Sequence, residues 1–460
     1  MSVDDLGGFG DARLRKVGAA LLAAMQQTPT MCLHRLAKDR NQAVQFGRFL
    51  DNDAVSADEM LVQAGRLTGQ RAAGRHVLAI QDTTELHFAT HRASKRGFGL
   101  AGNGWDIGLF IHPVVVMDAQ HGGLIGLAGA QVLNRPPGAI ADRRKRTTEE
   151  KESHRWLAAS LAAGEVLSQA SGITVIADRE GDIYDLFANR PAHVDLLIRA
   201  AQDRALAPGG RLFAHCADWP EQDRRTIDVP AKGRQPHEGR QPGRVATVAL
   251  RFGDVTLRRP QNGIRSQTDT VTLRVVDVTE IDPPPQQTPV HWCLLTTHAV
   301  PTLAEARQIV AWYRCRWAIE QVFRTLKTDG VRIEASQIID AANFVKLAVA
   351  ALIAAVRVMQ IVLGRDGSTG QMLTDAADAA DIPALSAINR RLEGRTDKLK
   401  NPHNPRSLAW FSWIVARLGG WSGYTSSGYK PPGPKTVFRG LLRLDGMIEG
   451  WKLANHSAVV

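Results

Sequence analysis

The sequence predicts a mixed α/β protein whose sheet is interrupted by a β-rich insertion and flanked by helical regions at both ends. Short apolar segments alternate with amphipathic helical patterns between residues 76 and 199. Alternating strand patterns follow between about 201 and 300, and helical spacing dominates residues 1–70 and the chain from about 301 to 418. Strands and helices that alternate along a chain are typical of α/β sheets.

The first 70 residues are expected to form a small helical module. One segment carries apolar residues at helical spacing, namely Leu14, Val17, Leu21 and Met25. Further along, Ser56 and Glu59 fit a capping box, in which each side chain satisfies a free backbone amide at the start of a helix. Because the module is rich in Arg, Lys and Gln, it is either a surface helical domain or a DNA-contacting one.

Residues 71–336 are expected to form the α/β core. Five strands are predicted in HVLAIQD (76–82), LFIHPVVVMD (109–118), GLIGLAGAQVL (123–133), GITVIAD (172–178) and HVDLLIRA (193–200). A charged loop and an amphipathic helix precede the fourth strand, and a second helix follows it. Within the insertion, GRQP repeats at 233 and 239 and indicates a mobile loop.

Residues 337–460 are expected to form a helical C-terminal domain. The apolar segment 347–356 is too short to cross a membrane and predicts a buried helix. Residues 407–418 are the last strongly periodic helix, and the chain beyond is looser and rich in Gly and Pro. The N-terminus has no apolar segment typical of a signal peptide, so a cytoplasmic protein is expected.

Charge and cysteine content narrow the function. The 460 residues include 57 Lys and Arg against 46 Asp and Glu, a net charge of +11 spread along the chain. A folded basic protein commonly has a polyanionic partner, most often nucleic acid. The four cysteines form no C-x-x-C pair, which argues against a structural zinc module and a disulfide framework.

Three acids stand where α/β sheets present functional groups. Asp82 and Asp178 each end an apolar strand, and Glu320 lies on a helix expected to pack across the sheet. Converging carboxylates need cations to neutralise them, and oxygen donors suit Mg²⁺ or Mn²⁺ in a two-metal phosphoryl-transfer site. Each Asp has an alternative role as helix cap, turn acid or ion-pair partner, and neighbouring acids compete for the function: Glu85, Glu180, Asp182 and Asp185.

The segment WYRCRWAIEQVFRTLKT (312–328) is predicted to form one helix. Four of its polar residues lie within an arc of roughly 60°: Tyr313, Arg316, Glu320 and Lys327. A carboxylate beside cationic donors suits chemistry on a phosphodiester. The alternative is a ladder of salt bridges on a solvated face, although bulky residues on the other faces favour a covered helix.

The same four residues match Y-x2-R-x3-E-x6-K, the signature of the insertion-sequence-four family of bacterial DDE transposases. IQDTTEL resembles the family segment with the first Asp, and IADREGDIYDL resembles that with the second. Further segments are similar in family order, including GRFLDNDAVSADEM, EEKESHRWLAAS, VHWCLLTTHAV and SLAWFSWIVARLGG. The resemblance therefore covers nearly the whole chain.

The resemblance implies an RNase H-like core in which Asp82, Asp178 and Glu320 bind two Mg²⁺ or Mn²⁺ ions. It also implies DNA contacts by Tyr313, Arg316, Lys327, Trp292, Arg199 and Arg324, with Trp292 stacked on a flipped base. Judged by residue type alone, Trp292 could instead be a core residue and Arg199 a surface ion-pair partner.

The sequence departs from the family at Ala89, where the family has an Arg downstream of the first Asp. Nearby His87, His91 or Arg92 could substitute for that Arg. A zinc pair at His87 and His91 is the less favoured interpretation, because no further ligand is evident nearby.

The resemblance predicts a cut-and-paste transposase that binds terminal inverted repeats, cleaves both strands through a hairpin and joins the 3′ ends to target DNA. Its partners would be double-stranded DNA and a second subunit, with no membrane and no nucleotide cofactor, at the bacterial nucleoid in the cytoplasm. Two alternatives are a catalytically impaired DNA-binding inhibitor of transposition and a metal-dependent nuclease that does not transfer strands.

Overall fold

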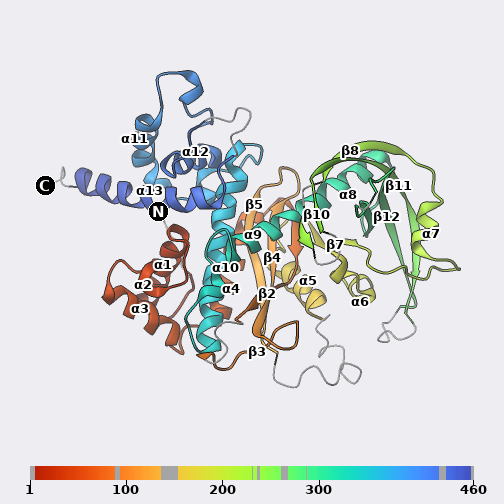
Figure 1. Ribbon diagram of the computed structural model, residues 1–460, viewed down its shortest axis with the longest axis horizontal. Helices are drawn as coiled ribbons and strands as arrows, with labels where there is room; N and C mark the ends of the chain where they lie inside the picture. The colour runs from red at the N-terminus through yellow and green to blue at the C-terminus, as the bar shows by residue number, and fades with distance from the viewer. Residues whose placement is uncertain are drawn as a thin grey trace. The chain divides into compact units, whose positions relative to one another are not determined.

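The computed structural model describes residues 6–88, 94–135, 154–229, 232–235, 239–260, 268–285, 287–423 and 431–456 (Figure 1). The chain divides into two compact units. The first consists of Met1–Arg144, Glu165–Ser171 and Trp317–Val460. The second consists of Lys145–Gly164 and Gly172–Arg316. The mixed α/β class with helices at both ends of the chain is confirmed.

The first unit begins with the helices expected in residues 1–70: α1 (Ala12–Gln27), α2 (Leu33–Leu36), α3 (Arg40–Asp51) and α4 (Ala57–Ala72). Aspartate side chains cap two of them, since Asp11 accepts a hydrogen bond from Arg13 N and Asp39 accepts one from Gln42 N. Both α1 and α4 pack against the long helix α10 (Ala341–Leu363).

The predicted capping box at the start of α4 is only half correct. Ser56 Oγ accepts a hydrogen bond from Glu59 N at 3.1 Å, as expected. The Glu59 carboxylate instead accepts one from Gly8 N at 2.7 Å. Glu59 therefore ties the segment before α1 to α4, because a distant backbone amide competes successfully for its carboxylate.

The strands of the first unit are β1 (His76–Gln81), β2 (Thr84–His87), β3 (Gly99–Leu100), β4 (Ile107–Asp118) and β5 (Leu124–Leu133). β1, β2, β3 and β5 all pair antiparallel with β4. At the predicted turn before β5, Gly122 has φ +68°, which glycine adopts at little cost. β2 and β3 were not predicted, because four and two residues are too short to show a period.

The other helices of the first unit come from the C-terminal part of the chain: α9 (Trp317–Lys327), α10, α11 (Ile382–Leu392), α12 (Leu408–Leu418) and α13 (Pro434–His456). Short 3-10 turns lie at Ile333–Ala335, Gly364–Asp366, Leu373–Asp375, Ala379–Asp381 and Asp397–Leu399. The expectation that α12 is the last periodic helix was wrong. α13 buries Val437, Phe438, Leu441, Leu444 and Ile448, and the Gly- and Pro-rich segment before it obscured this spacing.

The helix that contains the apolar segment 347–356 is longer than that segment, since α10 extends from Ala341 to Leu363. Among the described residues, Ala341–Asp366 is long and apolar enough by length and composition to cross a membrane. Within its most apolar window, however, 89% is buried in the structure. α10 is therefore a core helix of the first unit, as the buried-helix prediction required.

The second unit contains a mixed sheet. Its strands are β6 (Gly172–Ala177), β7 (Val194–Arg199), β8 (Asp223–Val229), β11 (Arg244–Arg258), β12 (Thr270–Glu280) and β13 (His291–Thr296), in the order β6-β7-β13-β12-β11-β8. β6 and β7 run parallel, and β13 pairs antiparallel with β7. The strands of the predicted insertion therefore belong to the same sheet as β6 and β7.

The helices of this part are α5 (His154–Val166), α6 (Tyr184–Ala188), α7 (Leu212–Ala217) and α8 (Leu303–Cys315), with a 3-10 turn at Arg179–Gly181. α7 was not predicted. The expected mobile loop around the GRQP repeat was wrong for the residues described, because β9 (Lys232–Gln235) and β10 (Gly239–Gln241) pair antiparallel.

The segment 312–328 is not one helix. α8 ends at Cys315 and α9 begins at Trp317, with Arg316 between them. Arg316 N donates to Tyr313 O at 3.0 Å, an i→i−3 bond that tightens the turn at this point. The four polar residues of the predicted helix thus divide between the two units, with Tyr313 and Arg316 in the second.

Candidate active site

In the second unit, Asp178 is the centre of a polar cluster. It directly follows β6, as the strand pattern predicted, and its side chain is 29% exposed. The Tyr313 hydroxyl donates a hydrogen bond to Asp178 Oδ1 at 3.0 Å. Burial first, and then the charge of Asp178, raise the pKa of the Tyr313 hydroxyl well above its ordinary value. This phenol therefore stays a hydrogen-bond donor over the whole neutral range.

Two guanidinium groups neutralise Asp178. Arg199, at the end of β7, has Nη1 3.6 Å from Asp178 Oδ1. Arg316, in the turn between α8 and α9, has Nη2 3.7 Å from Asp178 Oδ2. Arg199 also donates from Nη2 to His291 O at 2.8 Å, which fixes its direction. Planar guanidinium groups held in this way are well suited to phosphate oxygens.

Trp292 is half-buried and lies beside Tyr313. Its ring centroid lies 5.7 Å from that of Tyr313, with the planes tilted by 59°. The antiparallel pairing of β13 with β12 and β7 brings it there, since Trp292 pairs with Val278 and the nearby Leu294 pairs with Arg199. Among the predicted DNA contacts, Arg199, Tyr313 and Arg316 therefore lie around the Asp178 carboxylate, and Trp292 lies beside Tyr313.

The first unit holds the other two predicted metal ligands. Asp82 lies in the two-residue link between β1 and β2, and its Oδ1 accepts a hydrogen bond from Thr83 N at 2.7 Å. The Thr83 hydroxyl lies 2.9 Å from Nδ1 of the buried His112, so this turn is anchored to β4. Glu320 lies in the first turn of α9 and is half-buried.

Lys327 and Arg324 also lie on α9, in different surroundings. The Lys327 ammonium is 26% exposed and lies 3.9 Å from Glu334 Oε1. Burial lowers the pKa of Lys327, while the charges of Glu334 and Glu85 oppose that change. Arg324 is 71% exposed and forms an ion pair with Asp329 at 2.6 Å. The sequence carries no signal for Glu334, because α9 ends before it and no period connects it to Lys327.

The structure gives the competing acids near Asp178 different roles. Asp182 is fully buried and forms an ion pair with Arg204 at 2.6 Å. It also accepts hydrogen bonds from the backbone N–H groups of Ala201 and Gln202. Glu180 is 67% exposed and forms a surface ion pair with Arg155. Asp182 is thus part of the structural core, and Asp178 is the accessible strand-end acid with cationic neighbours.

The candidate metal ligands are all carboxylates. Among the described residues, no group of three or more His, Cys, Asp or Glu side chains lies close enough to hold a metal ion. The donor set predicted from the sequence, Asp82, Asp178 and Glu320, offers carboxylate oxygens, which are the ligands that Mg²⁺ and Mn²⁺ prefer. In chemical type these side chains fit divalent cations. His91 and Arg92, together with Ala89, lie outside the described residues.

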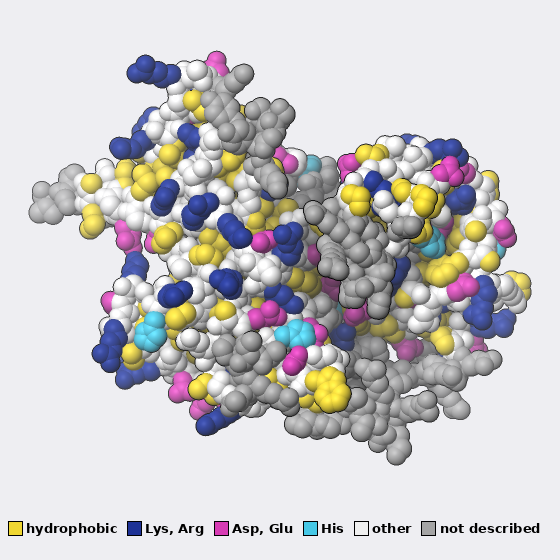
Figure 2. Space-filling model, viewed as in Figure 1, with side chains coloured by type: hydrophobic (Ala, Val, Ile, Leu, Met, Phe, Trp, Pro, Cys, Tyr) yellow, Lys and Arg dark blue, Asp and Glu magenta, His cyan; other side chains and the backbone are white. Residues whose placement is uncertain are grey.

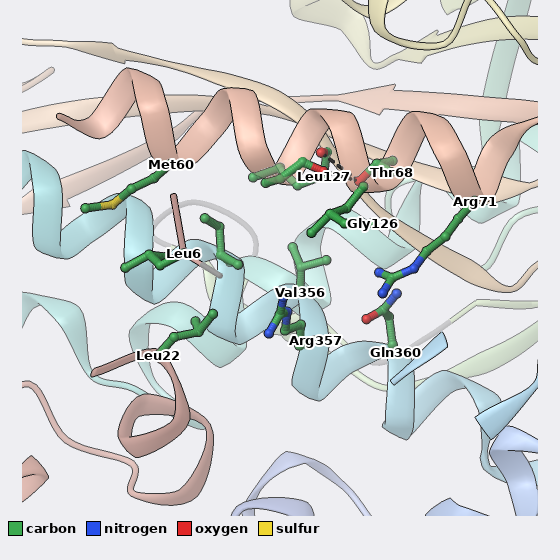
Figure 3. A pocket seen from close by; sticks show the side chains of 13 residues that line it. Leu6, Leu22, Met60, Thr68, Arg71, Gly126, Leu127, Val356, Arg357 and Gln360 are labelled. Atoms are coloured by element: carbon green, nitrogen blue, oxygen red, sulfur yellow. Dashed lines mark hydrogen bonds between the residues drawn. The ribbon is translucent and has the colours of Figure 1, made fainter. Parts of the chain in front are cut away.

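The first unit also contains a cavity between α4, β5 and α10 (Figure 3). Its volume is about 30 Å³, enough for one or two water molecules and far too small for a nucleotide. Thr68 donates to Leu127 O at 2.9 Å, and Gln360 donates to Ile125 O at 2.6 Å. These bonds tie α4 and α10 to β5, so the cavity belongs to the scaffold.

Basic side chains are spread over the visible surface, as they are spread along the sequence. Lys and Arg side chains are scattered over the visible face in Figure 2 and do not gather into a single patch. Specific placement around carboxylates, as at Asp178, therefore distinguishes the candidate site better than overall charge.

Part of the chain is similar to a known family. Residues 140–357 match the model of a family described as "Transposase DDE domain". The matched range contains Asp178, Glu320 and the cluster around Asp178, whereas Asp82 lies before it. The match supports a DDE transposase, an enzyme of the DNA-cleaving and strand-transfer class that acts on DNA and generally requires divalent metal ions.

Tyr313→Phe tests the buried hydrogen bond to Asp178. The unfolded chain loses the Tyr313 proton near pH 10, whereas the folded chain retains it because its pKa is raised. The unfolded state then binds fewer protons than the folded state, so the free energy of unfolding falls as pH rises through about 10. At pH 11 this loss is about 1 kcal/mol relative to neutral pH. Tyr313→Phe is expected to remove this part of the fall when urea unfolding is compared at pH 8 and pH 11. Equal falls in both proteins would contradict the prediction.

Proposed function

We propose that this protein is a cut-and-paste DNA transposase of the insertion-sequence-four family, with an RNase H-like core and the Y-R-E-K signature. The observation that carries the proposal is the cluster around Asp178, which lies within the range matching the transposase DDE family. A strand-end carboxylate flanked by two guanidinium groups, a buried phenol and an indole ring suits binding and cleavage of a phosphodiester.

Each residue has a proposed role. Two Mg²⁺ or Mn²⁺ ions held by Asp82, Asp178 and Glu320 would supply the charge that activates the attacking oxygen and stabilises the leaving oxygen. Arg199, Arg316, Lys327 and Arg324 would donate to phosphate oxygens, Tyr313 would orient the Asp178 carboxylate and contact phosphate, and Trp292 would stack on a base flipped out of the transposon end.

The proposed reaction uses one site for every step. Water first breaks the phosphodiester bond at the end of the element and leaves a 3′-hydroxyl. This hydroxyl attacks the opposite strand, which forms a hairpin and releases the flanking DNA. Water reopens the hairpin, and the 3′-hydroxyl then attacks the target strand. Each step exchanges one oxygen for another at phosphorus, so no nucleotide cofactor is consumed.

The other parts of the chain would hold the DNA and a second subunit. Residues 1–70 and the β-rich segment at about 201–300 would bind the terminal repeats, as parts flanking and interrupting the catalytic core of residues 71–336. The helices of residues 337–460 would pair two subunits in a synaptic complex. The reaction would take place at the nucleoid in the bacterial cytoplasm.

The test uses purified full-length protein and duplexes taken from the DNA that flanks its gene, where short terminal inverted repeats are expected. Nicks, hairpins and joining to a target plasmid are measured with Mg²⁺, with Mn²⁺ and with EDTA. Metal-dependent cleavage at the repeats followed by joining supports the transposase. Cleavage without joining would identify a nuclease, and binding without cleavage would identify an inhibitor.

A further inference from the structure

One carboxylate in the first unit connects two segments that carry proposed catalytic acids. Glu334 Oε1 accepts a hydrogen bond from His87 N at 3.1 Å. The same oxygen lies 3.9 Å from the Lys327 ammonium. His87 ends β2, five residues after Asp82, and Lys327 ends α9, which carries Glu320. Glu334 thus joins the end of this strand to the end of this helix through a single oxygen atom.

The turn that presents Glu334 has an unusual backbone. Arg332 has φ +58° and ψ +52°, in the left-handed region that non-glycine residues rarely adopt. Buried neighbours enforce this conformation, since Val331 and Ile333 are fully buried and Val331 N donates to Thr325 O at 2.9 Å. A strained residue persists only where its surroundings determine it, and such residues concentrate at functional sites.

Lys327 faces a second carboxylate as well. The charge of Glu85, on β2, acts on Lys327 in the same direction as that of Glu334. Glu85 itself is held in place, because its Oε2 lies 3.1 Å from His87 Nε2 and its Oε1 accepts a hydrogen bond from Gly102 N. The ammonium is therefore positioned by a small network rather than by one flexible partner.

A surface ion pair would be the simpler interpretation, since exposed pairs contribute little and often have no function. Two observations favour a specific role. The Glu334 carboxylate binds a backbone amide, whose position is set by β2, and the lysine is mostly buried. An exposed pair such as Asp397 with Lys400, where the Asp side chain is 94% exposed, has neither property.

We propose that Glu334 is a positioning residue for phosphoryl transfer, which directs the Lys327 ammonium toward the phosphate and holds the end of β2 against α9. This inference rests on the proposed transposase function, because it gives Lys327 a phosphate to contact. Glu334 itself would touch neither DNA nor the reacting atoms. It acts through Lys327 and through the segment that follows Asp82.

The test compares Glu334→Ala, Glu334→Gln and Glu334→Asp with wild type on an end-containing duplex with Mg²⁺. Single-turnover cleavage is expected to fall about 10²-fold in Glu334→Ala, the scale of a misplaced catalytic group. Glu334→Gln keeps an oxygen for His87 N but loses the charge, so an intermediate fall of about tenfold is expected. Glu334→Asp should recover part of the rate, and DNA affinity should change less than about threefold in all three variants.

The pH profile separates positioning from general damage. Loss of the Glu334 charge lowers the pKa of Lys327, so the alkaline limb of the cleavage rate should move to lower pH in Glu334→Gln. Unfolding would instead lower the rate equally at every pH, and thermal melting would reveal it. Asp397→Asn, which removes an exposed carboxylate, serves as the matched control and should behave as wild type.

The outcomes distinguish the two proposals. If wild type shows no metal-dependent cleavage, the transposase proposal fails irrespective of Glu334. If wild type cleaves and Glu334→Gln matches it in rate and alkaline limb, the role of Glu334 is wrong while the function stands. A reduced rate with an unmoved limb and a lowered melting temperature would likewise overturn the positioning role.

Discussion

Glu320→Ala is expected to reduce metal-dependent cleavage of end DNA by at least about 10³-fold while binding of that DNA is retained. Loss of one of the three proposed carboxylate ligands would give up several kcal/mol of charge stabilisation, and each 1.36 kcal/mol corresponds to about tenfold in rate. Glu320 is half-buried in the first turn of α9 and makes no contribution to the apolar core. Its removal should therefore leave the fold intact.

The measurement pairs single-turnover cleavage with gel-shift binding, each with Mg²⁺ and with EDTA. Gln321→Ala is the matched control, because it shortens the adjacent side chain of the same helix without removing a carboxylate. Glu320→Ala with a cleavage rate near wild type would show that α9 is a DNA-binding or structural helix, and the proposed mechanism would be wrong.

Asp182→Ala is expected to destabilise the second unit by about 3–5 kcal/mol, the cost of leaving one member of a buried ion pair without its partner. Asp182 and Arg204 are 0% and 4% exposed in their side chains. Asp182 also accepts the backbone N–H groups of Ala201 and Gln202, which would lose their acceptor. The free energy of unfolding is measured by urea titration, followed by a probe of the second unit.

The control for this prediction lies two residues away. Glu180→Ala removes an acid of the same turn, but its surface pair with Arg155 is worth about 0–1 kcal/mol. Asp178→Ala should likewise fold, because Asp178 is partly exposed, yet it should not cleave DNA. An Asp182→Ala protein as stable as wild type and inactive in cleavage would reverse the roles assigned to these two acids.

Local pattern was sufficient to predict several parts of the site. Asp82 and Asp178 each follow a short apolar run in the sequence. In the structure, each run forms a strand that ends one residue before the acid. The single helix expected from the spacing breaks at Arg316, although Tyr313 and Arg316, which that spacing selected, both lie beside Asp178. Periodicity and chain breaks are properties of neighbouring residues, so the sequence contains them directly.

Several elements were lost because their signals are short or hidden. β2 and β3 are too short to display a period, and α13 follows a segment rich in Gly and Pro that indicated irregular structure. The break at Arg316 was also missed. No Pro or Gly marks it, and it coincides with the point where the chain passes from one unit to the other.

The amino-acid sequence by itself determined the α/β class, the strand-end positions of Asp82 and Asp178, and the polar residues of α8 and α9. Only the tertiary structure decided that Asp182 is buried against Arg204, whereas Asp178 lies between Arg199 and Arg316. It also decided that Glu334 reaches both His87 and Lys327. The physical reason is that a carboxylate's role depends on its burial and on its charged neighbours. Several of those neighbours are distant in the chain, as Tyr313 is from Asp178 and His87 is from Glu334, and only folding brings them together.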